Sequence, residues 1–106
     1  MKEYSFEKLE VWQDCRILTK QIYQITKKFP EDERFGLTNQ IRRSVISVSS
    51  NIVEGSYRST NKDKANFMNI AYSSLMELLS QLILSKDLEY LTDNILSDLR
   101  EQIEKI

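Results

Sequence analysis

The chain has 106 residues, of which 41% are hydrophobic and 29% charged, the balance of one soluble globular domain with a modest core. It contains no histidine, so the commonest general base and the commonest metal ligand are both missing. The net charge of −1 argues against a protein that coats nucleic acid by charge alone.

The N-terminus, MKEYSFEKLEVW, is charged and lacks the apolar run of a signal peptide. No apolar stretch in the sequence approaches the roughly 20 residues that cross a bilayer. Cys15 is the single cysteine, which excludes an intramolecular disulfide and favours a reducing compartment. We therefore expect a cytoplasmic protein with no membrane segment.

The first predicted helix covers residues 6–29. Ser5 is a plausible N-cap, with Glu7 in the first turn where a negative charge suits the helix dipole. Pro30 ends the helix and opens an acidic turn. Apolar residues repeat at steps of four and three, the period of bundle packing: Val11, Cys15, Leu18, Ile22, Ile25 and Phe29.

The second predicted helix covers residues 35–57 and ends where Glu54-Gly55-Ser56 weakens helix propensity. One side carries Leu37, Ile41, Val45, Val48 and Ile52. Small polar residues lie between them and allow close helix approach and hydrogen bonds to the preceding turn: Ser44, Ser47, Ser49 and Ser50.

The third predicted helix covers residues 62–88, after a capping pair formed by Thr60 and Asp63. It has two apolar seams: Met68, Ala71, Leu75, Leu78 and Leu82, then Tyr72, Met76, Leu79 and Ile83. A helix that is apolar nearly all round must be covered on nearly all sides. The surplus over one four-helix bundle points to a subunit interface.

The last predicted helix covers residues 92–106, with Thr92 and Asp93 at its start. Two glycines and one proline are few for this length, which favours long helices joined by short loops. The elements predict an all-α, antiparallel, up-and-down four-helix bundle with one domain over residues 1–106.

The charges are unevenly placed along the chain. Residues 34–64 hold six basic and two acidic side chains, a net charge of +4, and residues 65–106 hold three basic and seven acidic, a net charge of −4. Guanidinium groups suit phosphate geometry. The candidate nucleic-acid-binding residues are Arg42, Arg43, Arg58, Lys62 and Lys64.

Structural roles are an alternative for these arginines, which could pair with Glu54 or with the acidic 31–33 turn of a neighbouring subunit. Glu54 could instead pair with Arg58, four residues on, or become buried between subunits or against Arg43. The candidate interface residues are Ser49, Glu54, Tyr72, Met76, Leu79 and Ile83.

No catalytic residue, metal ligand or cofactor site stands out, and we expect a protein that is not an enzyme. Cys15 falls on the inward seam of the first helix, where a thiol behaves as a small apolar side chain. The serines of the second helix have no adjacent general base. Trp12 and Tyr57 could stack on bases, but the position of Trp12 beside the first seam favours a core role.

Three blocks occur in order: FEKLEVWQDCRIL, KKFPEDERFGLTNQIRRSVISVSSNIVEG and NFMNIAYSSLMELLSQLILSKDLEYL. Over roughly residues 5–91 they resemble the four-helix bundle proteins encoded in intervening sequences of bacterial 23S ribosomal RNA genes. That family usually has a proline at the position of Ser49, which would bend the second helix. Whether this chain has a kink there stays open.

The resemblance implies a ring-shaped homopentamer with a positively charged channel or face. The accessory protein of diversity-generating retroelements is a similar pentamer that associates with a reverse transcriptase and nucleic acid. Two hypotheses follow: an oligomeric scaffold that binds RNA or DNA, or an interaction module that docks a partner protein.

Overall fold

The computed structural model describes residues 1–106 and contains helices and no strands. The elements are η1 (Ser5–Lys8), α1 (Glu10–Thr26), η2 (Glu31–Glu33), α2 (Leu37–Ser56), α3 (Asn61–Asp87) and α4 (Asp93–Glu104). The four predicted helices are all present, and the predicted all-α bundle is confirmed. The acidic turn after Pro30 is the short 3-10 helix η2.

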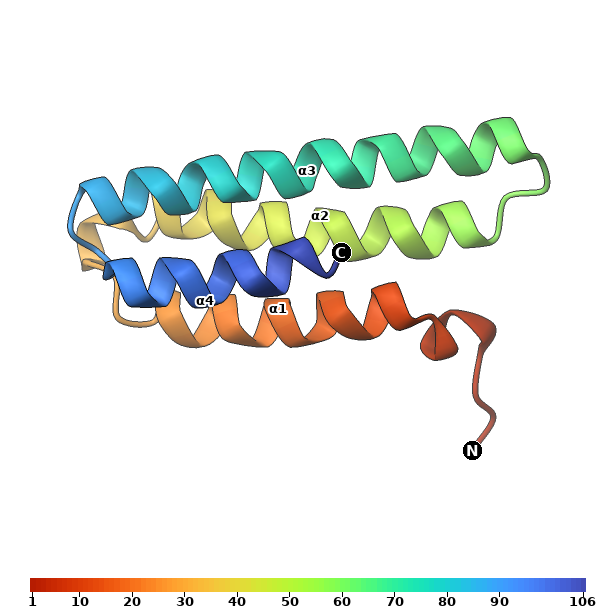
Figure 1. The fold of residues 1–106 in the computed structure, drawn as a ribbon, viewed down its shortest axis with the longest axis horizontal. Coiled ribbons are helices and arrows are strands. Elements are labelled where there is room, and N and C mark those ends of the chain that lie inside the picture. Colours follow the sequence, from red (N-terminus) through yellow and green to blue (C-terminus); the bar gives the residue numbers. More distant parts are fainter.

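The bundle is built around a long hairpin of α2 and α3, which lie side by side over their length (Figure 1). Helix α1 packs against α2, and α4 lies against both α3 and α1. The chain runs up and down through the four helices in turn (Figure 1). Helix α4 has 12 residues and α3 has 27, so α4 covers only the C-terminal part of α3.

One core joins all four helices and follows the predicted seams. Helix α1 contributes Cys15, Leu18 and Ile22, and α2 contributes Ile41, Val45, Val48 and Ile52; α3 contributes Ala71, Leu75, Leu78 and Leu82, and α4 contributes Leu99 and Ile103. Phe29 and Leu91, from the connecting segments, close the core at one end. The sequence therefore encodes the bundle through one buried stripe per helix.

The beginning of the first helix differs from the prediction. Leu9 has extended backbone dihedrals (φ −69°, ψ 124°), so the 3-10 helix η1 is separated from α1, which begins at Glu10. Ser5 is not the N-cap of α1. Its hydroxyl donates a hydrogen bond to the Tyr57 hydroxyl at 3.0 Å, which ties the N-terminal segment to the end of α2.

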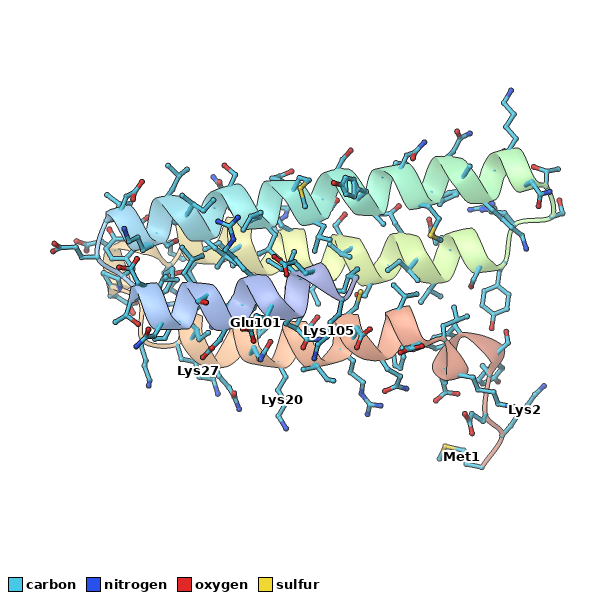
Figure 2. All side chains as sticks on the ribbon, in the orientation of Figure 1. Met1, Lys2, Lys20, Lys27, Glu101 and Lys105 are labelled. Atoms are coloured by element: carbon cyan, nitrogen blue, oxygen red, sulfur yellow. The ribbon has the colours of Figure 1, made fainter.

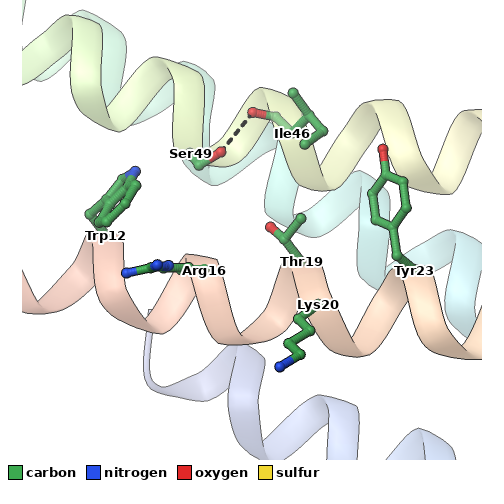
Figure 3. A pocket seen from close by; sticks show the side chains of 7 residues that line it. All are labelled: Trp12, Arg16, Thr19, Lys20, Tyr23, Ile46 and Ser49. Carbon is green, nitrogen blue, oxygen red and sulfur yellow. Dashed lines mark hydrogen bonds between the residues drawn. The ribbon is translucent and has the colours of Figure 1, made fainter. Parts of the chain in front are cut away.

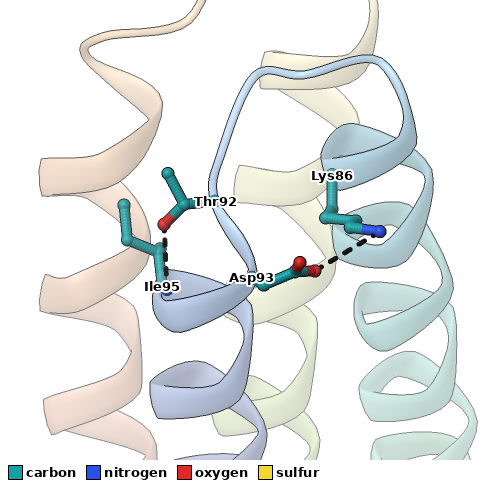
Figure 4. A network of polar contacts seen from close by, with 4 residues as sticks. All are labelled: Lys86, Thr92, Asp93 and Ile95. Carbon is teal, nitrogen blue, oxygen red and sulfur yellow. Dashed lines mark hydrogen bonds and ion pairs between the residues drawn. The ribbon is translucent and has the colours of Figure 1, made fainter.

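Threonine caps start α3 and α4, as predicted. The Thr60 hydroxyl oxygen accepts a hydrogen bond from the Asp63 backbone N–H at 3.1 Å. Thr92 accepts in the same way from the Ile95 N–H at 3.2 Å (Figure 4). Beside this cap, Lys86 and Asp93 form an ion pair at 3.3 Å between α3 and the first turn of α4.

Helix α2 is continuous from Leu37 to Ser56, with no break at Ser49. The Ser49 hydroxyl donates to the Ile46 carbonyl oxygen at 3.0 Å, the back-bond predicted for this serine. Gly55 is buried near the end of the helix. A Cβ atom there would lie 2.9 Å from the Phe67 Cβ atom and 2.7 Å from the Met68 Cε atom, so Gly55 allows α2 and α3 to approach closely.

The second apolar seam of α3 is divided between the bundle and solvent. Leu79 and Ile83 are half-buried, and Leu79 packs against the core. Tyr72 and Met76 stay exposed, at 60% and 37%. The bundle itself therefore covers part of this seam, and Tyr72 and Met76 are its most exposed members.

Contrary to the expectation from the sequence, α3 is long and apolar enough to cross a membrane by length and composition alone. Its best 18-residue window has a mean hydropathy of 1.2, and 28% of that window is buried. This is weak evidence for a membrane span, because the core helix of a soluble protein meets the same criterion.

Candidate interaction surfaces

Cys15 is buried in the core, as predicted. Burial, helped by the nearby charge of Asp14, raises the pKa of the Cys15 thiol to about 11. The thiol is therefore protonated at neutral pH and is a poor nucleophile. No three His, Cys, Asp or Glu side chains come together in a group that could hold a metal ion.

Arg42 is engaged inside the subunit. Its Nε donates to the Thr26 hydroxyl at 2.9 Å, and one terminal nitrogen reaches the Tyr23 carbonyl oxygen at 3.5 Å. The guanidinium also lies over the Tyr23 ring, 4.6 Å from its centroid. Because Lys27, just after α1, is the C-cap, Arg42 places a positive charge where the helix dipole favours one. Arg42 is thus a structural link between α1 and α2.

Arg43, the next residue, is exposed and makes no ion pair. It lies beside a polar hollow of about 450 Å³ between α2 and α3. In this hollow Ser47 and Ser74 share a hydrogen bond of 2.8 Å, and Ser44 donates to Glu77 at 3.3 Å. These bonds use the small polar residues of α2 to join the hairpin and leave the Arg43 guanidinium available.

The remaining candidate cations lie at the tip of the α2–α3 hairpin. The Arg58 guanidinium lies over the Phe67 ring at 4.5 Å, and Lys62 and Lys64 are exposed on the first turn of α3. Arg43 and Arg58 are 15 positions apart, about 20 Å along a helix. The candidate binding residues therefore form two separate groups: Arg43 on the side of α2, and the hairpin tip of Arg58, Lys62 and Lys64.

Glu54 is exposed and forms no ion pair within the subunit. The predicted pairs with Arg58 and with Arg43 are both absent. The two ion pairs of the subunit lie elsewhere: one joins Lys86 to Asp93, and the other joins Arg34 to Glu31 at 3.6 Å. Glu54 remains a candidate for contact with a neighbouring subunit only.

A hollow of about 500 Å³, which we name the α1–α2 groove, runs between these helices (Figure 3). It is lined by Trp12, Arg16, Thr19, Lys20, Tyr23, Ile46 and Ser49. Trp12 is half-buried and packs edge-on against Phe6 at 5.0 Å, so its predicted core role is wrong. The Arg16 guanidinium lies 5.5 Å from the centroid of the Trp12 ring. The lining includes two cations and no carboxylate.

A second hollow, which we name the α3–α4 groove, has a volume of about 270 Å³ and a mainly apolar lining. Its lining joins three candidate interface residues of α3 to the end of α4: Tyr72, Leu75, Met76, Leu79, Arg100, Ile103, Glu104 and Ile106. Ser49 is thus in one groove, and Tyr72, Met76 and Leu79 are in the other.

The family model of the 23S rRNA-intervening sequence protein matches residues 7–106. The chain belongs to this family. The match extends beyond the three sequence blocks to include α4.

A solved structure supports the same assignment. It is a protein with unknown function from the S23 ribosomal protein family of Bacteroides thetaiotaomicron. The two structures superpose with a TM-score of 0.82, at 25% sequence identity over 90% of this chain and 89% of that one. No curated protein matches the chain. This member of the 23S rRNA-intervening sequence family thus shares its fold with a relative of unknown function, and neither comparison names an enzyme.

The α1–α2 groove was not predicted from the sequence, although a signal for it exists. Trp12, Arg16 and Lys20 follow one another at four-residue steps, and Tyr23 lies near them on the same side of the helix. In the sequence, the position of Trp12 beside the core seam favours a core role instead. Only the packing of α2, with Ile46 exposed beside it, makes the stripe one wall of a groove.

Proposed function

We propose that this protein is a non-enzymatic, homo-oligomeric four-helix bundle scaffold that binds RNA or DNA through Arg43 and the hairpin tip. The observation that carries the proposal is that Arg43, Arg58, Lys62 and Lys64 are exposed and none has a carboxylate partner. They belong to the only part of the chain, residues 34–64, with a strong positive balance. Free cations are the groups that phosphate contacts require.

Oligomerisation is the second part of the proposal, because four cations on one subunit give only a weak field. Symmetric copies would repeat Arg43 and the tip around an axis and multiply the field. The family resemblance favours five copies. The exposed Tyr72 and Met76 support association, since apolar side chains at such a surface favour a protein contact.

A catalytic role has little support from the arrangement of side chains. The chain has no histidine, and its one thiol is buried with a raised pKa. The serines of α2 donate to the backbone or bond to other polar side chains of the hairpin. One of these contacts joins Ser44 to a carboxylate, Glu77, at 3.3 Å, and none joins a serine to a lysine.

The second candidate function is an accessory module that docks a partner protein. The engagement of Arg42 with Thr26 and Tyr23 favours it, because one of the five candidate binding residues serves the fold. Affinity purification distinguishes the two functions. A protein partner that survives nuclease treatment favours the accessory module, whereas co-purified RNA with no protein partner favours the scaffold.

Fluorescence anisotropy with a structured RNA and a DNA duplex tests nucleic-acid binding directly. Four phosphate contacts predict an affinity for the duplex that falls about 100-fold between 50 and 200 mM salt. A variant with Arg43, Arg58, Lys62 and Lys64 all changed to alanine should lose most of this binding. The matched control removes four exposed cations elsewhere: Lys2, Lys8, Lys27 and Lys28 to alanine. Binding that is absent, or equally reduced in both variants, contradicts the proposal.

A further inference from the structure

The hollows on the surface of the bundle differ in the balance of their charges. The polar hollow between α2 and α3 is lined by one cation, Arg43, and one carboxylate, Glu77. The α3–α4 groove likewise has one of each, Arg100 and Glu104. A hollow of about 160 Å³ that includes Val11 is lined by apolar side chains alone. The α1–α2 groove differs from these three, because it has two cations and no carboxylate.

The positive lining of the α1–α2 groove continues along α2. An adjoining hollow of about 430 Å³ shares Tyr23 and Ile46 with the groove and adds Arg42 and Arg43, again without a carboxylate. Residues 37–53 of α2 include no Asp or Glu at all. The face between α1 and α2 therefore suits a partner that carries negative charge.

Arg16 and Lys20 hold their charges at the edge of an apolar floor. Both side chains are exposed and neither forms an ion pair, and Lys20 projects away from the bundle (Figure 2). The floor is made by Trp12, Tyr23 and Ile46 (Figure 3), and Ile46 is 43% exposed. A partner that covers this floor and places carboxylates beside the cations would gain both apolar burial and charge complementarity.

The polar groups of the groove are already used within the two helices. The Thr19 hydroxyl donates to the Cys15 carbonyl oxygen at 2.8 Å, and the Ser49 hydroxyl donates to the Ile46 carbonyl oxygen at 3.0 Å. The backbone groups of α1 and α2 are paired inside the helices. An extended peptide binds mainly through main-chain hydrogen bonds and would find few partners here. A helix satisfies its own backbone, so it needs only the floor and the cations.

The groove also has the dimensions of a seat for a helix. Trp12 and Tyr23 are 11 positions apart on α1 (23 − 12), which is about 16 Å along the helix axis. Trp12, Arg16 and Lys20 repeat at four-residue steps, so this wall presents one side chain per turn. An amphipathic helix with apolar residues at positions i, i+4 and i+7 has the same repeat. About three turns of a partner helix would lie along the groove.

Two other occupants fit the groove less well. Base stacking by a nucleic acid needs free aromatic faces, whereas Arg16 lies over the Trp12 ring and Arg42 lies over the Tyr23 ring. A second copy of this chain would have to offer an acidic amphipathic helix. Helix α4 is acidic, but its apolar stripe is packed into its own core.

We infer that the α1–α2 groove binds an acidic amphipathic helix of a different protein. The apolar side of that helix covers the floor of the groove, and its carboxylates lie beside Arg16 and Lys20. The inference goes beyond nucleic-acid binding and rests on the second candidate function, the docking of a partner protein, for which it gives the surface and the chemistry of the partner. The hairpin tip lies outside the groove, so helix docking and nucleic-acid binding can be tested separately.

The probe is a designed peptide of about 14 residues, or about four helical turns, with leucines at i, i+4 and i+7 and glutamates on the other faces. Fluorescence anisotropy of the labelled peptide measures its affinity for the 106-residue chain. With the unlabelled peptide, emission of Trp12, the single tryptophan, reports contact with the floor. We expect saturable binding and a blue shift of this emission. A lysine-for-glutamate peptide and a scrambled acidic peptide should each bind about tenfold more weakly or worse.

The first groove variant tests the cations. Arg16→Glu with Lys20→Glu changes exposed side chains only and should weaken binding of the acidic peptide by about tenfold. The matched control reverses two exposed cations of the hairpin tip, Lys62→Glu with Lys64→Glu, and should bind the peptide as the wild type does. Circular dichroism checks folding, and the single change Lys20→Glu replaces a double variant that does not fold.

The second groove variant tests the apolar floor. Ile46→Gln should weaken binding of the peptide by about fivefold, because a polar side chain gains less from burial. Ile17→Gln is its matched control, since Ile17 is 50% exposed on α1 and does not line the groove. The control should leave the affinity for the peptide unchanged.

The outcomes that overturn the inference are distinct. A wild type that does not bind the acidic peptide, or that binds the scrambled or the lysine peptide equally well, shows that the groove is not a seat for an acidic helix. Equal losses for a groove variant and its matched control place any binding elsewhere. A wild type that ignores the peptide, together with an Arg16→Glu and Lys20→Glu variant that loses RNA binding, identifies the groove as a nucleic-acid surface.

The same variants separate this inference from the nucleic-acid scaffold. The groove variants should keep their affinity for RNA, whereas the Lys62→Glu and Lys64→Glu control should lose affinity for RNA and keep its affinity for the peptide. If the wild type binds the peptide through the groove but binds no RNA, the inference is supported and the scaffold is contradicted. If it binds RNA through the hairpin tip but no peptide, the scaffold is supported and the inference is overturned.

Discussion

Arg42 and Thr26 join α1 to α2 through a hydrogen bond of 2.9 Å from the guanidinium Nε to the threonine hydroxyl. Thr26 is buried, and its hydroxyl donates in turn to the Ile22 carbonyl oxygen at 2.7 Å. The neighbouring Arg43 has no such partner. Two adjacent arginines of one sequence motif thus have different roles, one in the fold and one on the surface.

The first prediction follows from this difference. Arg42→Ala should lower the free energy of unfolding by about 1–2 kcal/mol, because it removes hydrogen bonds from a charged donor and leaves the Thr26 oxygen with one fewer partner. Arg43→Ala should change it by less than about 0.5 kcal/mol. Urea denaturation measures both. Equal losses for the two variants contradict the assigned roles.

The second prediction concerns the close approach of α2 and α3. Gly55→Ala should destabilise the protein by about 1–3 kcal/mol, because the added Cβ meets the Phe67 Cβ atom at 2.9 Å and the helices must move apart. Thermal unfolding measures the loss. Ser50→Ala, at an exposed position of α2, is the control and should be nearly neutral. A Gly55→Ala protein as stable as the wild type shows that the helix separation is adjustable.

The third prediction uses the buried thiol. The Cys15 pKa is raised from 9.0 to about 11 in the folded protein, so the folded state holds this proton more tightly than the unfolded state. The contribution of the Cys15 thiol to the free energy of unfolding is fully present below pH 9 and declines as the pH rises toward 11. Urea denaturation across this range should show a steeper decline for the wild type than for Cys15→Ala. Parallel curves contradict the burial of the thiol.

The fourth prediction tests the two threonine caps. Thr60→Ala and Thr92→Ala should each cost about 1 kcal/mol, because each removes the acceptor for a backbone N–H in the first turn of a helix. Thr60→Ser and Thr92→Ser keep the hydroxyl and should restore most of the stability. Denaturation midpoints compare the four proteins. If a serine variant is as unstable as its alanine counterpart, the loss of stability comes from the threonine methyl group, and the capping role of the hydroxyl is contradicted.

The fold could be predicted because each helix carries a repeating apolar stripe, and these stripes are the buried core. The predicted start of the first helix was wrong. Ser5 and Glu7 resemble a helix start, whereas Leu9 adopts an extended conformation that a local sequence pattern does not reveal. The sequence also does not reveal that Leu79, in the second seam of α3, packs against the core of its own bundle. The predicted lengths of α3 and α4 do not reveal which residues of α3 are covered by α4.

The candidate surfaces were harder to predict than the fold. Arg42 and Arg43 look alike in a sequence, and only the position of Thr26 beside α2 separates them. Trp12 was assigned to the core because it flanks an apolar seam, yet it lies at the edge of a groove that requires α1 and α2 together. Surfaces formed between helices depend on relative placement, which periodicity alone does not give.

The oligomeric state on which the proposed scaffold depends can be read from the mass of the wild-type protein in solution, measured by light scattering after size exclusion. We predict a stable homo-oligomer, with five chains favoured by the family resemblance, and the same mass for the variant that lacks the four exposed cations. A stable monomer would contradict the proposed scaffold.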